Sequence, residues 1–152
     1  MDKLVDDFLG VFAVLRRGDQ YLMVQNERLI NGKLQLVWDL PGGRVESREM
    51  LQDALRRELL EETQLVLEGQ PEFVFLQEGE RVIAGARRYA WRSFFFKIEA
   101  AGEPVANNEV LGTRWMTKSE IEHECRAPYH LSFCEWLEQS DRSYFVSAWL
   151  DE

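Results

Sequence analysis

The stretch from Gly43 to Leu65, GRVESREMLQDALRRELLEETQL, decides the fold expected for this chain. It follows Pro41 and Gly42, which end the preceding strand, because proline cannot donate to a ladder and paired glycines favour a turn. Ser47 is a residue type favoured at helix N-caps, so the pattern predicts a helix over 47–63. Apolar side chains at helical spacing mark its buried face: Leu51, Ala54, Leu55 and Leu59.

Three glutamates near the end of this helix share the apolar face. Measured from the first residue of the apolar stripe at about 100° per residue, Glu58 falls at roughly −20°, Glu62 at roughly 20° and Glu61 at roughly −80°. Carboxylates gathered at the negative end of a helix dipole repel one another. A positive charge is therefore expected beside them, either Arg57 or a divalent cation, and oxygen ligands suit Mg²⁺ or Mn²⁺.

The spacing of these residues resembles the signature of the Nudix hydrolases. That signature reads Gly, five residues, Glu, seven residues, Arg-Glu, an aliphatic, any residue, Glu-Glu, any residue, Gly and an aliphatic. Its matching residues here are Gly43, Glu49, Arg57, Glu58, Leu59, Glu61, Glu62 and Leu65. The one departure is Gln64, where the family pattern has glycine. A non-glycine residue held in the left-handed conformation common after a helix costs roughly 1–2 kcal/mol.

The resemblance implies an α/β (α+β) fold, a Nudix-like α/β/α sandwich in which helices flank a central mixed β-sheet. The segment 89–99 supports it, because both its faces become apolar midway, as in a strand covered on both sides. Aromatic residues there could stack on a nucleobase, but core packing is their commoner role. We expect one Nudix hydrolase domain over residues 1–152. The apolar tail, 144–150, is expected to dock on the domain or on a partner chain, which leaves a homodimer open.

Local patterns predict the remaining elements. Strands are expected over 8–15, 20–25, 35–40, 64–67, 73–77, 89–99 and 109–116. Gly69 and Pro71 are expected to end one of them, and Glu78-Gly79-Glu80 another. Residues 26–33 are expected to form a connector with an Asn31-Gly32 turn. Helices are expected over 117–124, capped by Thr117 or Ser119, and over 129–139, with Leu131, Cys134 and Leu137 on its apolar face.

The composition argues against several classes of function and location. The net charge of −9 argues against a grip on extended nucleic acid and fits a protein that recruits metal ions to screen an anionic substrate. The two cysteines, Cys125 and Cys134, make no disulfide framework and indicate a reducing cytoplasm. No stretch reaches the roughly 20 apolar residues of a membrane span. The acidic N-terminal segment, MDKLVDD, lacks the pattern of a signal peptide.

The resemblance implies a small-molecule substrate, a nucleoside diphosphate linked to another group: a nucleoside triphosphate, a nucleotide sugar or ADP-ribose, with the first two favoured. The chemistry that fits is metal-assisted hydrolysis of a phosphoanhydride. We predict Glu58 and Glu62 as the main metal ligands for Mg²⁺ or Mn²⁺, and Glu61 as a further ligand, directly or through water. The resemblance adds the backbone carbonyl of Gly42, a residue that lets main chain approach an ion closely.

The general base is predicted among Glu58, Glu61 and Glu109. The assignment of Glu109 rests only on its position, because family members often supply a further acid from a late loop or strand. Glu103 is an alternative for the same role. Arg57 is expected to support catalysis by holding the carboxylates in place, pairing with Glu49.

Two other functions stay open. One is a nucleotide-binding regulatory module on the same fold that does not hydrolyse its ligand, supported by Gln64 alone. The other is an isomerase of an isoprenoid diphosphate, whose chemistry, as the resemblance implies, uses a cysteine with a glutamate. Cys125 and Cys134 both lie in the late helical region, away from the predicted site, which argues against it.

Overall fold

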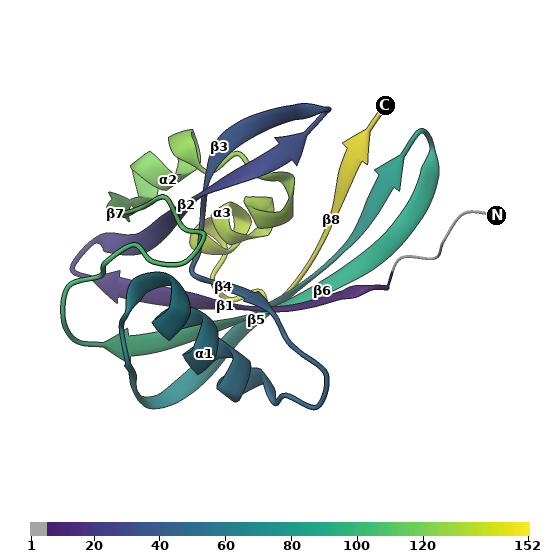
Figure 1. Cartoon of the computed structure of the whole chain (residues 1–152). Helices are drawn as coiled ribbons and strands as arrows, with labels where there is room; N and C mark the ends of the chain where they lie inside the picture. Colours follow the sequence, from purple (N-terminus) through teal and green to yellow (C-terminus); the bar gives the residue numbers. More distant parts are fainter. Residues whose placement is uncertain (1–5) are drawn as a thin grey trace.

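A computed structural model of the chain describes residues 6–152, so most of the acidic N-terminal segment lies outside the described residues. Within that range the strands form an eight-stranded mixed sheet of order β3-β2-β1-β6-β5-β8, with β4 paired to β1 and β7 to β2 (Figure 1). The strands are β1 (Phe8–Arg17), β2 (Gln20–Ile30), β3 (Lys33–Asp39), β4 (Gly42–Arg44), β5 (Leu67–Ile83), β6 (Ala86–Ala100), β7 (Gly112–Thr117) and β8 (Tyr144–Asp151). The helices are α1 (Leu51–Thr63), α2 (Lys118–Glu124), η1 (Pro128–His130) and α3 (Leu131–Glu138).

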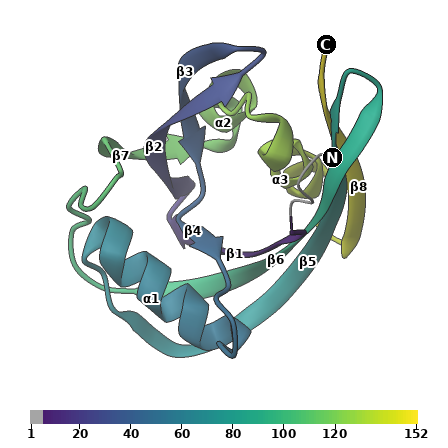
Figure 2. The same cartoon turned by 45° about the vertical axis from the view of Figure 1, so that its right-hand side comes forward.

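The sheet is strongly curled, with α1 on one side and α2 and α3 on the other (Figure 2). Strand β1 contributes side chains to the cores on both sides of the sheet, because successive side chains of a strand point to opposite faces. Val11 and Ala13 belong to the core under α1, whereas Phe12 and Val14 belong to the core under α3. The predicted sandwich of helices around a mixed sheet is confirmed.

Strand β6 is the central strand that its apolar faces predicted. It pairs in parallel with β1 on one side and antiparallel with β5 on the other. Phe96 packs into the core under α1, while Phe95 stacks on Phe75 at 4.1 Å between ring centroids in the core under α3. Aromatic stacking of this kind makes β6 the strand that joins the two cores.

Strand β5 corrects the prediction of two short strands over 64–67 and 73–77. It runs unbroken from Leu67 to Ile83, because a register shift between Glu68 and Glu72 absorbs Gly69 and Pro71. Gly79 does not end the strand either. A Cβ there would lie 2.3 Å from the indole of Trp91, so glycine leaves room for that ring.

Other boundaries also differ from prediction. Helix α1 begins at Leu51 rather than Ser47; its N-cap is Met50, and Arg48 has a positive φ of 68°. Strand β2 continues through the expected connector to Ile30, and the Asn31-Gly32 turn follows as predicted. Strand β7 begins at Gly112, because residues 109–111 still belong to the preceding loop.

The C-terminal elements confirm one prediction and correct another. Thr117 caps α2 in a reciprocal capping box with Glu120. In α3 the buried residues are Ser132, Phe133 and Trp136, whose aromatic rings pack toward β5. Of the predicted face, Cys134 and Leu137 are partly buried against the same core, whereas Leu131 is exposed.

The apolar tail docks on the domain. It forms β8, which pairs in parallel with β5 and buries Phe145, while the homodimer stays a prediction. Cys125 and Cys134 are free thiols, and the reducing location stays a prediction. Among the described helices none is long and apolar enough to cross a membrane.

Candidate active site

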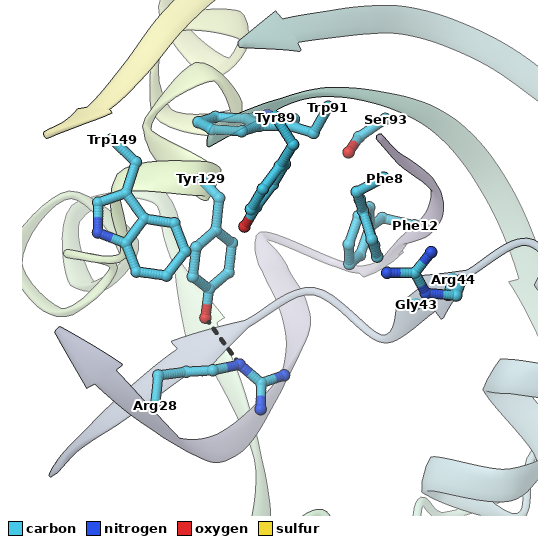
Figure 3. A pocket seen from close by; sticks show the side chains of 10 residues that line it. All are labelled: Phe8, Phe12, Arg28, Gly43, Arg44, Tyr89, Trp91, Ser93, Tyr129 and Trp149. Carbon is cyan, nitrogen blue, oxygen red and sulfur yellow. Dashed lines mark hydrogen bonds between the residues drawn. The ribbon is translucent and has the colours of Figure 1, made fainter. Parts of the chain in front are cut away.

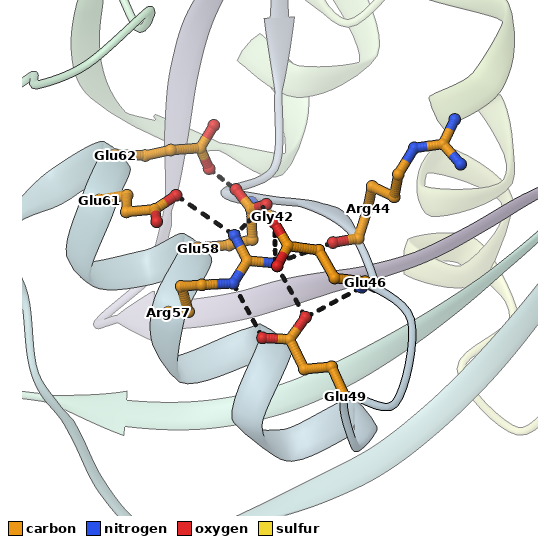
Figure 4. A network of polar contacts seen from close by, with 8 residues as sticks. All are labelled: Gly42, Arg44, Glu46, Glu49, Arg57, Glu58, Glu61 and Glu62. Atoms are coloured by element: carbon orange, nitrogen blue, oxygen red, sulfur yellow. Dashed lines mark hydrogen bonds and ion pairs between the residues drawn. The ribbon is translucent and has the colours of Figure 1, made fainter.

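The acidic end of α1 lies beside the glycine turn that leads into β4 (Figure 4). Strand β4 is held against β1 by the pairs Phe12–Gly42 and Val11–Gly43. The apolar face of α1, with Leu55 and Leu59 fully buried, packs in one core with Val11 and Ala13 of β1. Core packing of α1 and strand pairing of β4 therefore bring the predicted carboxylates to the turn.

Arg57 is the centre of the polar network at this site. Its Nε and Nη2 donate to the two carboxylate oxygens of Glu49 at 2.8 and 2.9 Å. Its Nη1 donates to Glu58 at 3.0 Å and to Glu61 at 3.3 Å, and its Nη2 also donates to the carbonyl of Arg44 at 3.0 Å. The predicted pairing of Arg57 with Glu49 is present, as a two-point contact that fixes the guanidinium plane.

The Arg57 network sets the charge state of Glu49. The hydrogen bonds from Arg57 and then from the backbone of Glu46 lower the pKa of Glu49 to about 2, because both favour the ionised form. Glu49 is therefore ionised at neutral pH, and its Oε1 also accepts from the backbone N–H of Glu46 at 3.0 Å, which orders the loop before α1.

Glu62 is the most buried of the three helix carboxylates, at 9% exposure. Its Oε1 accepts a hydrogen bond from the backbone N–H of Gly42 at 2.7 Å. Burial raises the pKa of Glu62 to about 8, although the bond from Gly42 opposes the shift. A carboxylate in this position gains from any cation that offsets its lost hydration.

Two glycines allow close approach at the turn, Gly42 toward β1 and Gly43 toward Glu58. Gly42 has a φ of 150°, and a Cβ there would lie 2.1 Å from the carbonyl oxygen of Val11. A Cβ on Gly43 would lie 2.8 Å from the carboxyl carbon of Glu58. Burial raises the pKa of Glu58, while Arg57 opposes the shift. Glycine is therefore required at both positions by close approach, and at position 42 also by a positive φ.

The donor set fits a hard divalent cation in its chemistry. Glu58, Glu61 and Glu62 supply only oxygen atoms, as Mg²⁺ and Mn²⁺ prefer. In residues 6–152 no three Asp, Glu, His or Cys side chains are grouped as a metal-ligand set. Glu58 and Glu61 are instead turned toward Arg57, and Glu62 toward Gly42.

The two further candidate acids, Glu103 and Glu109, lie in the loop between β6 and β7. Glu109 is exposed in the loop between β6 and β7, two residues after Asn107, whose N–H donates to the Glu62 carbonyl at 3.1 Å. That bond places the loop beside the end of α1. Glu103 instead lies 3.7 Å from Arg17, with 87% of its side chain exposed. The same loop is also anchored near Glu103, because Val105 donates its N–H to the Thr63 carbonyl at the end of α1 at 2.9 Å.

An aromatic pocket of about 320 Å³ lies next to the glycine turn (Figure 3). Gly43 and Arg44 form part of its wall, so it adjoins the acidic cluster. Its ring-bearing residues are Phe8, Phe12, Tyr89, Trp91, Tyr129 and Trp149. Sequence reasoning missed this pocket as a site, and only the aromatic residues of 89–99 signalled it.

Comparisons with known proteins identify the family of this chain. A family model, described as the NUDIX domain, matches residues 7–137. The chain is similar to YvcI of Bacillus subtilis (strain 168), described as an uncharacterized Nudix hydrolase, with 28% identity over 121 residues covering 76% of this chain and 70% of that protein.

Solved structures share the fold. A MutT protein from Bacillus halodurans superposes with a TM-score of 0.75 at 24% identity, covering 93% of this chain and 89% of that one. The E. coli ORF135 protein superposes with a TM-score of 0.71 at 22% identity, covering 88% and 90%. Because the family model spans most of the described chain, including the acidic helix and the glycine turn, this chain belongs to the Nudix family and is a Nudix hydrolase.

Proposed function

We propose that this chain hydrolyses the diphosphate linkage of a nucleoside diphosphate joined to another group, with Mg²⁺ or Mn²⁺ as cofactor. The observation that carries the proposal is the convergence of Glu58 and Glu62 on the Gly42-Gly43 turn. Both carboxylates have pKa values raised by burial, so the site favours the arrival of positive charge.

Glu58, Glu61 and Glu62 would hold the metal, together with the backbone carbonyl of Gly42. When bound, the metal supplies the Lewis acidity that neutralises diphosphate oxygens and activates water. The net charge of −9 makes this screening necessary, since the protein and its substrate are both anionic.

The chain's own residues have separate tasks in this proposal. Arg57 positions Glu58 and Glu61 through its Nη1, while Glu49 holds the guanidinium from its other edge. A glutamate accepts the proton of the attacking water; Glu58 and Glu61 lie in the cluster, and Glu109 lies on the loop anchored beside it. Arg57 is thus a positioning residue, not the group that reacts.

The aromatic pocket supports a nucleotide as substrate. Its rings adjoin Gly43, so a base held there would leave its phosphates near the acidic cluster. We favour a nucleoside triphosphate or a nucleotide sugar over ADP-ribose, and a small molecule over extended nucleic acid. We further propose one domain over residues 1–152.

The test is a hydrolysis screen across nucleoside triphosphates, nucleotide sugars and ADP-ribose, with Mg²⁺, with Mn²⁺ and with EDTA. We expect release of a nucleoside monophosphate from at least one substrate, and its loss in EDTA. Tight binding of a nucleotide without any product, in all metal conditions, would favour the non-hydrolysing regulatory module instead.

A further inference from the structure

Strand β8 leaves one edge of the sheet open. It is the last strand in the sheet order and, within residues 6–152, it pairs with β5 alone (Figure 1). Edge strands present unpaired N–H and C=O groups, and many proteins protect them with lysine, proline or a bulge. From Tyr144 to Leu150, β8 has no charged residue and no proline, and its register with β5 is continuous. This edge can therefore accept another strand.

Two hydrogen bonds at the ends of β8 fix the direction of its backbone groups. The carbonyl of Ser143 accepts from the N–H of Leu76 at 2.8 Å. The carbonyl of Asp151 accepts from the N–H of Ala84 at 3.0 Å. Because alternate residues of a strand bond to the same neighbour, the odd-numbered residues of β8 face β5. The N–H and C=O groups of the even-numbered residues face the open edge: Tyr144, Val146, Ala148 and Leu150.

The side chains of these four residues form an exposed apolar strip, called here the β8 strip. Val146 and Leu150 are 65% and 64% exposed, and Tyr144 and Ala148 are exposed as well. Phe145, which points to the other face, is buried in the core under α3. The open edge thus combines unpaired backbone groups with apolar side chains that lack cover within residues 6–152.

The charges beside the β8 strip are paired with one another. Glu78 on β5 accepts from Nε of Arg92 at 2.7 Å, and Glu80 accepts from Nε of Arg87 at 2.8 Å. Repulsion between like charges opposes association of an acidic chain with itself. Because these glutamates are already neutralised, a second copy can approach the strip without meeting an unpaired charge there.

We propose that β8 pairs in antiparallel orientation with β8 of a second copy of this chain, about a two-fold axis at Ser147. In this register Tyr144 lies opposite the partner's Leu150, and Val146 lies opposite the partner's Ala148. Each such pair exchanges two hydrogen bonds, so every outward N–H and C=O of the strip is used. The same surface serves both copies, as a closed two-fold dimer requires.

Two charged residues outside the strip favour this register. Arg142 and Glu152 are both exposed, and an axis at residue 147 places Arg142 opposite the partner's Glu152. Nη2 of Arg142 already lies at the edge, where it donates to the Tyr144 carbonyl at 3.2 Å. A hollow of about 730 Å³ between the β2–β3 turn and the end of β8 leaves room for the partner's Arg142 beside Glu152. A shift of two residues would place Arg142 opposite the partner's Leu150 instead.

The opposite edge strand, β3, is less suited to a two-fold pair. Leu34 and Leu36 are exposed there too. However, Lys33 begins the strand, and its one acid, Asp39, is 2% exposed and so cannot face a partner. Pairing of β3 with itself would therefore lack matching charges at its ends.

The test is sedimentation equilibrium of the parent, Val146→Lys and Leu36→Lys, with no metal or nucleotide, so its outcome is independent of the proposed function. We expect a dimeric parent. Val146→Lys places like charges on both sides of the axis and should weaken the dimer about tenfold or more, with an unchanged melting temperature because the site is exposed. Leu36→Lys makes the same change on β3 and should dimerise like the parent. A monomeric parent, or a dimer lost only in Leu36→Lys, would overturn the proposal.

Ser147→Cys tests the position of the axis. Residues in a non-hydrogen-bonded antiparallel pair have Cα atoms about 4.5 Å apart, within the range of a disulfide. With oxidised glutathione, the two new thiols should form an intermolecular disulfide and release two molecules of reduced glutathione. The parent, with Cys125 and Cys134, and Val146→Cys, which does not lie opposite itself, should stay unlinked on a non-reducing gel. Failure of Ser147→Cys to link in a dimeric protein, or stronger linking of Val146→Cys, would contradict an axis at residue 147.

Discussion

The backbone N–H of Gly42 donates to Oε1 of Glu62 at 2.7 Å, which ties the glycine turn directly to the last turn of α1. Gly42 is itself paired with Phe12 on β1, a strand buried on both faces. The position of the Glu62 carboxylate is therefore set by the core of the sheet, and substitutions in the turn should act on the site through this contact.

Gly43→Ala should separate activity from stability at this turn. The atoms nearest to its new Cβ belong to the flexible end of Glu58, at 2.8 Å, so the fold should lose less than about 1 kcal/mol while the carboxylate is displaced. Gly42→Ala would meet the backbone of Val11 at 2.1 Å and should lose roughly 1–3 kcal/mol or more. Urea unfolding and a hydrolysis assay on both variants check this; equal destabilisation would contradict it.

Arg57→Lys should lower activity without unfolding the protein. Lysine keeps the charge but cannot bond both oxygens of Glu49 and also reach Glu58 and Glu61, so the carboxylates lose their order. We expect kcat to fall about 10- to 100-fold, as for partners that orient metal ligands. Arg56→Lys, one residue earlier and bonded only to backbone carbonyls of β5, is the control and should keep near-normal kcat.

Local periodicity explains how much of the helix could be predicted. Ala54, Leu55 and Leu59 are buried as expected, because a 3.6-residue period is visible within the segment itself. The start of α1 could not be predicted, since the side chain that orders residues 47–50 is Arg57, a full two turns into the helix. Capping signals describe local bonds only.

Long-range contacts explain the remaining differences between the predictions from sequence and the structure. Gly79 was interpreted as a strand breaker, whereas its role is to leave room for Trp91 on the neighbouring strand. The acidic cluster was predictable because its members lie on one helix. The aromatic pocket was not, because Phe8, Tyr129 and Trp149 come from β1, η1 and β8 and meet only in the folded chain.

Gln64→Gly should stabilise the protein and leave activity unchanged. Gln64 follows α1 with φ 63° and ψ 10°, the left-handed conformation expected at this position. Relief of that strain, less the extra chain entropy of glycine in the unfolded state, predicts a gain of about 0.5–1 kcal/mol. Gln64→Ala keeps the strain and should show no gain. Free energies of unfolding from urea titration measure both, and a loss of stability in Gln64→Gly would refute this explanation.

Because of His130, the free energy of unfolding should decrease as the pH is lowered from neutral. It is fully buried, and burial lowers its pKa below the usual value near 6.5, so the unfolded chain binds a proton that the folded chain rejects. Stability from this group is present above about pH 6.5 and is lost as the pH falls below it. The charged groups facing it are Asp39, 3.9 Å from its Nε2, and Arg28.

The measurement is the free energy of unfolding at about pH 7.5 and about pH 5.5, for the parent and for His130→Gln. We expect the parent to lose roughly 1 kcal/mol more than the variant over this interval. Comparing the two removes the contribution of other titrating groups, including Glu62, whose raised pKa acts in the opposite direction. An identical pH dependence in both proteins would show that His130 contributes nothing.

Glu62→Gln tests the metal site most directly, through Mn²⁺ binding by calorimetry and Mg²⁺-dependent hydrolysis on the same preparations. Glutamine can still accept from the Gly42 N–H and removes a buried charge, so the fold should be kept. Glu68→Gln, exposed on β5, is the matched control. We predict that Glu62→Gln loses about 100-fold or more in kcat and most of its Mn²⁺ affinity, while the control keeps both. Parent-like metal binding and turnover in Glu62→Gln would contradict the assignment of this carboxylate to a metal.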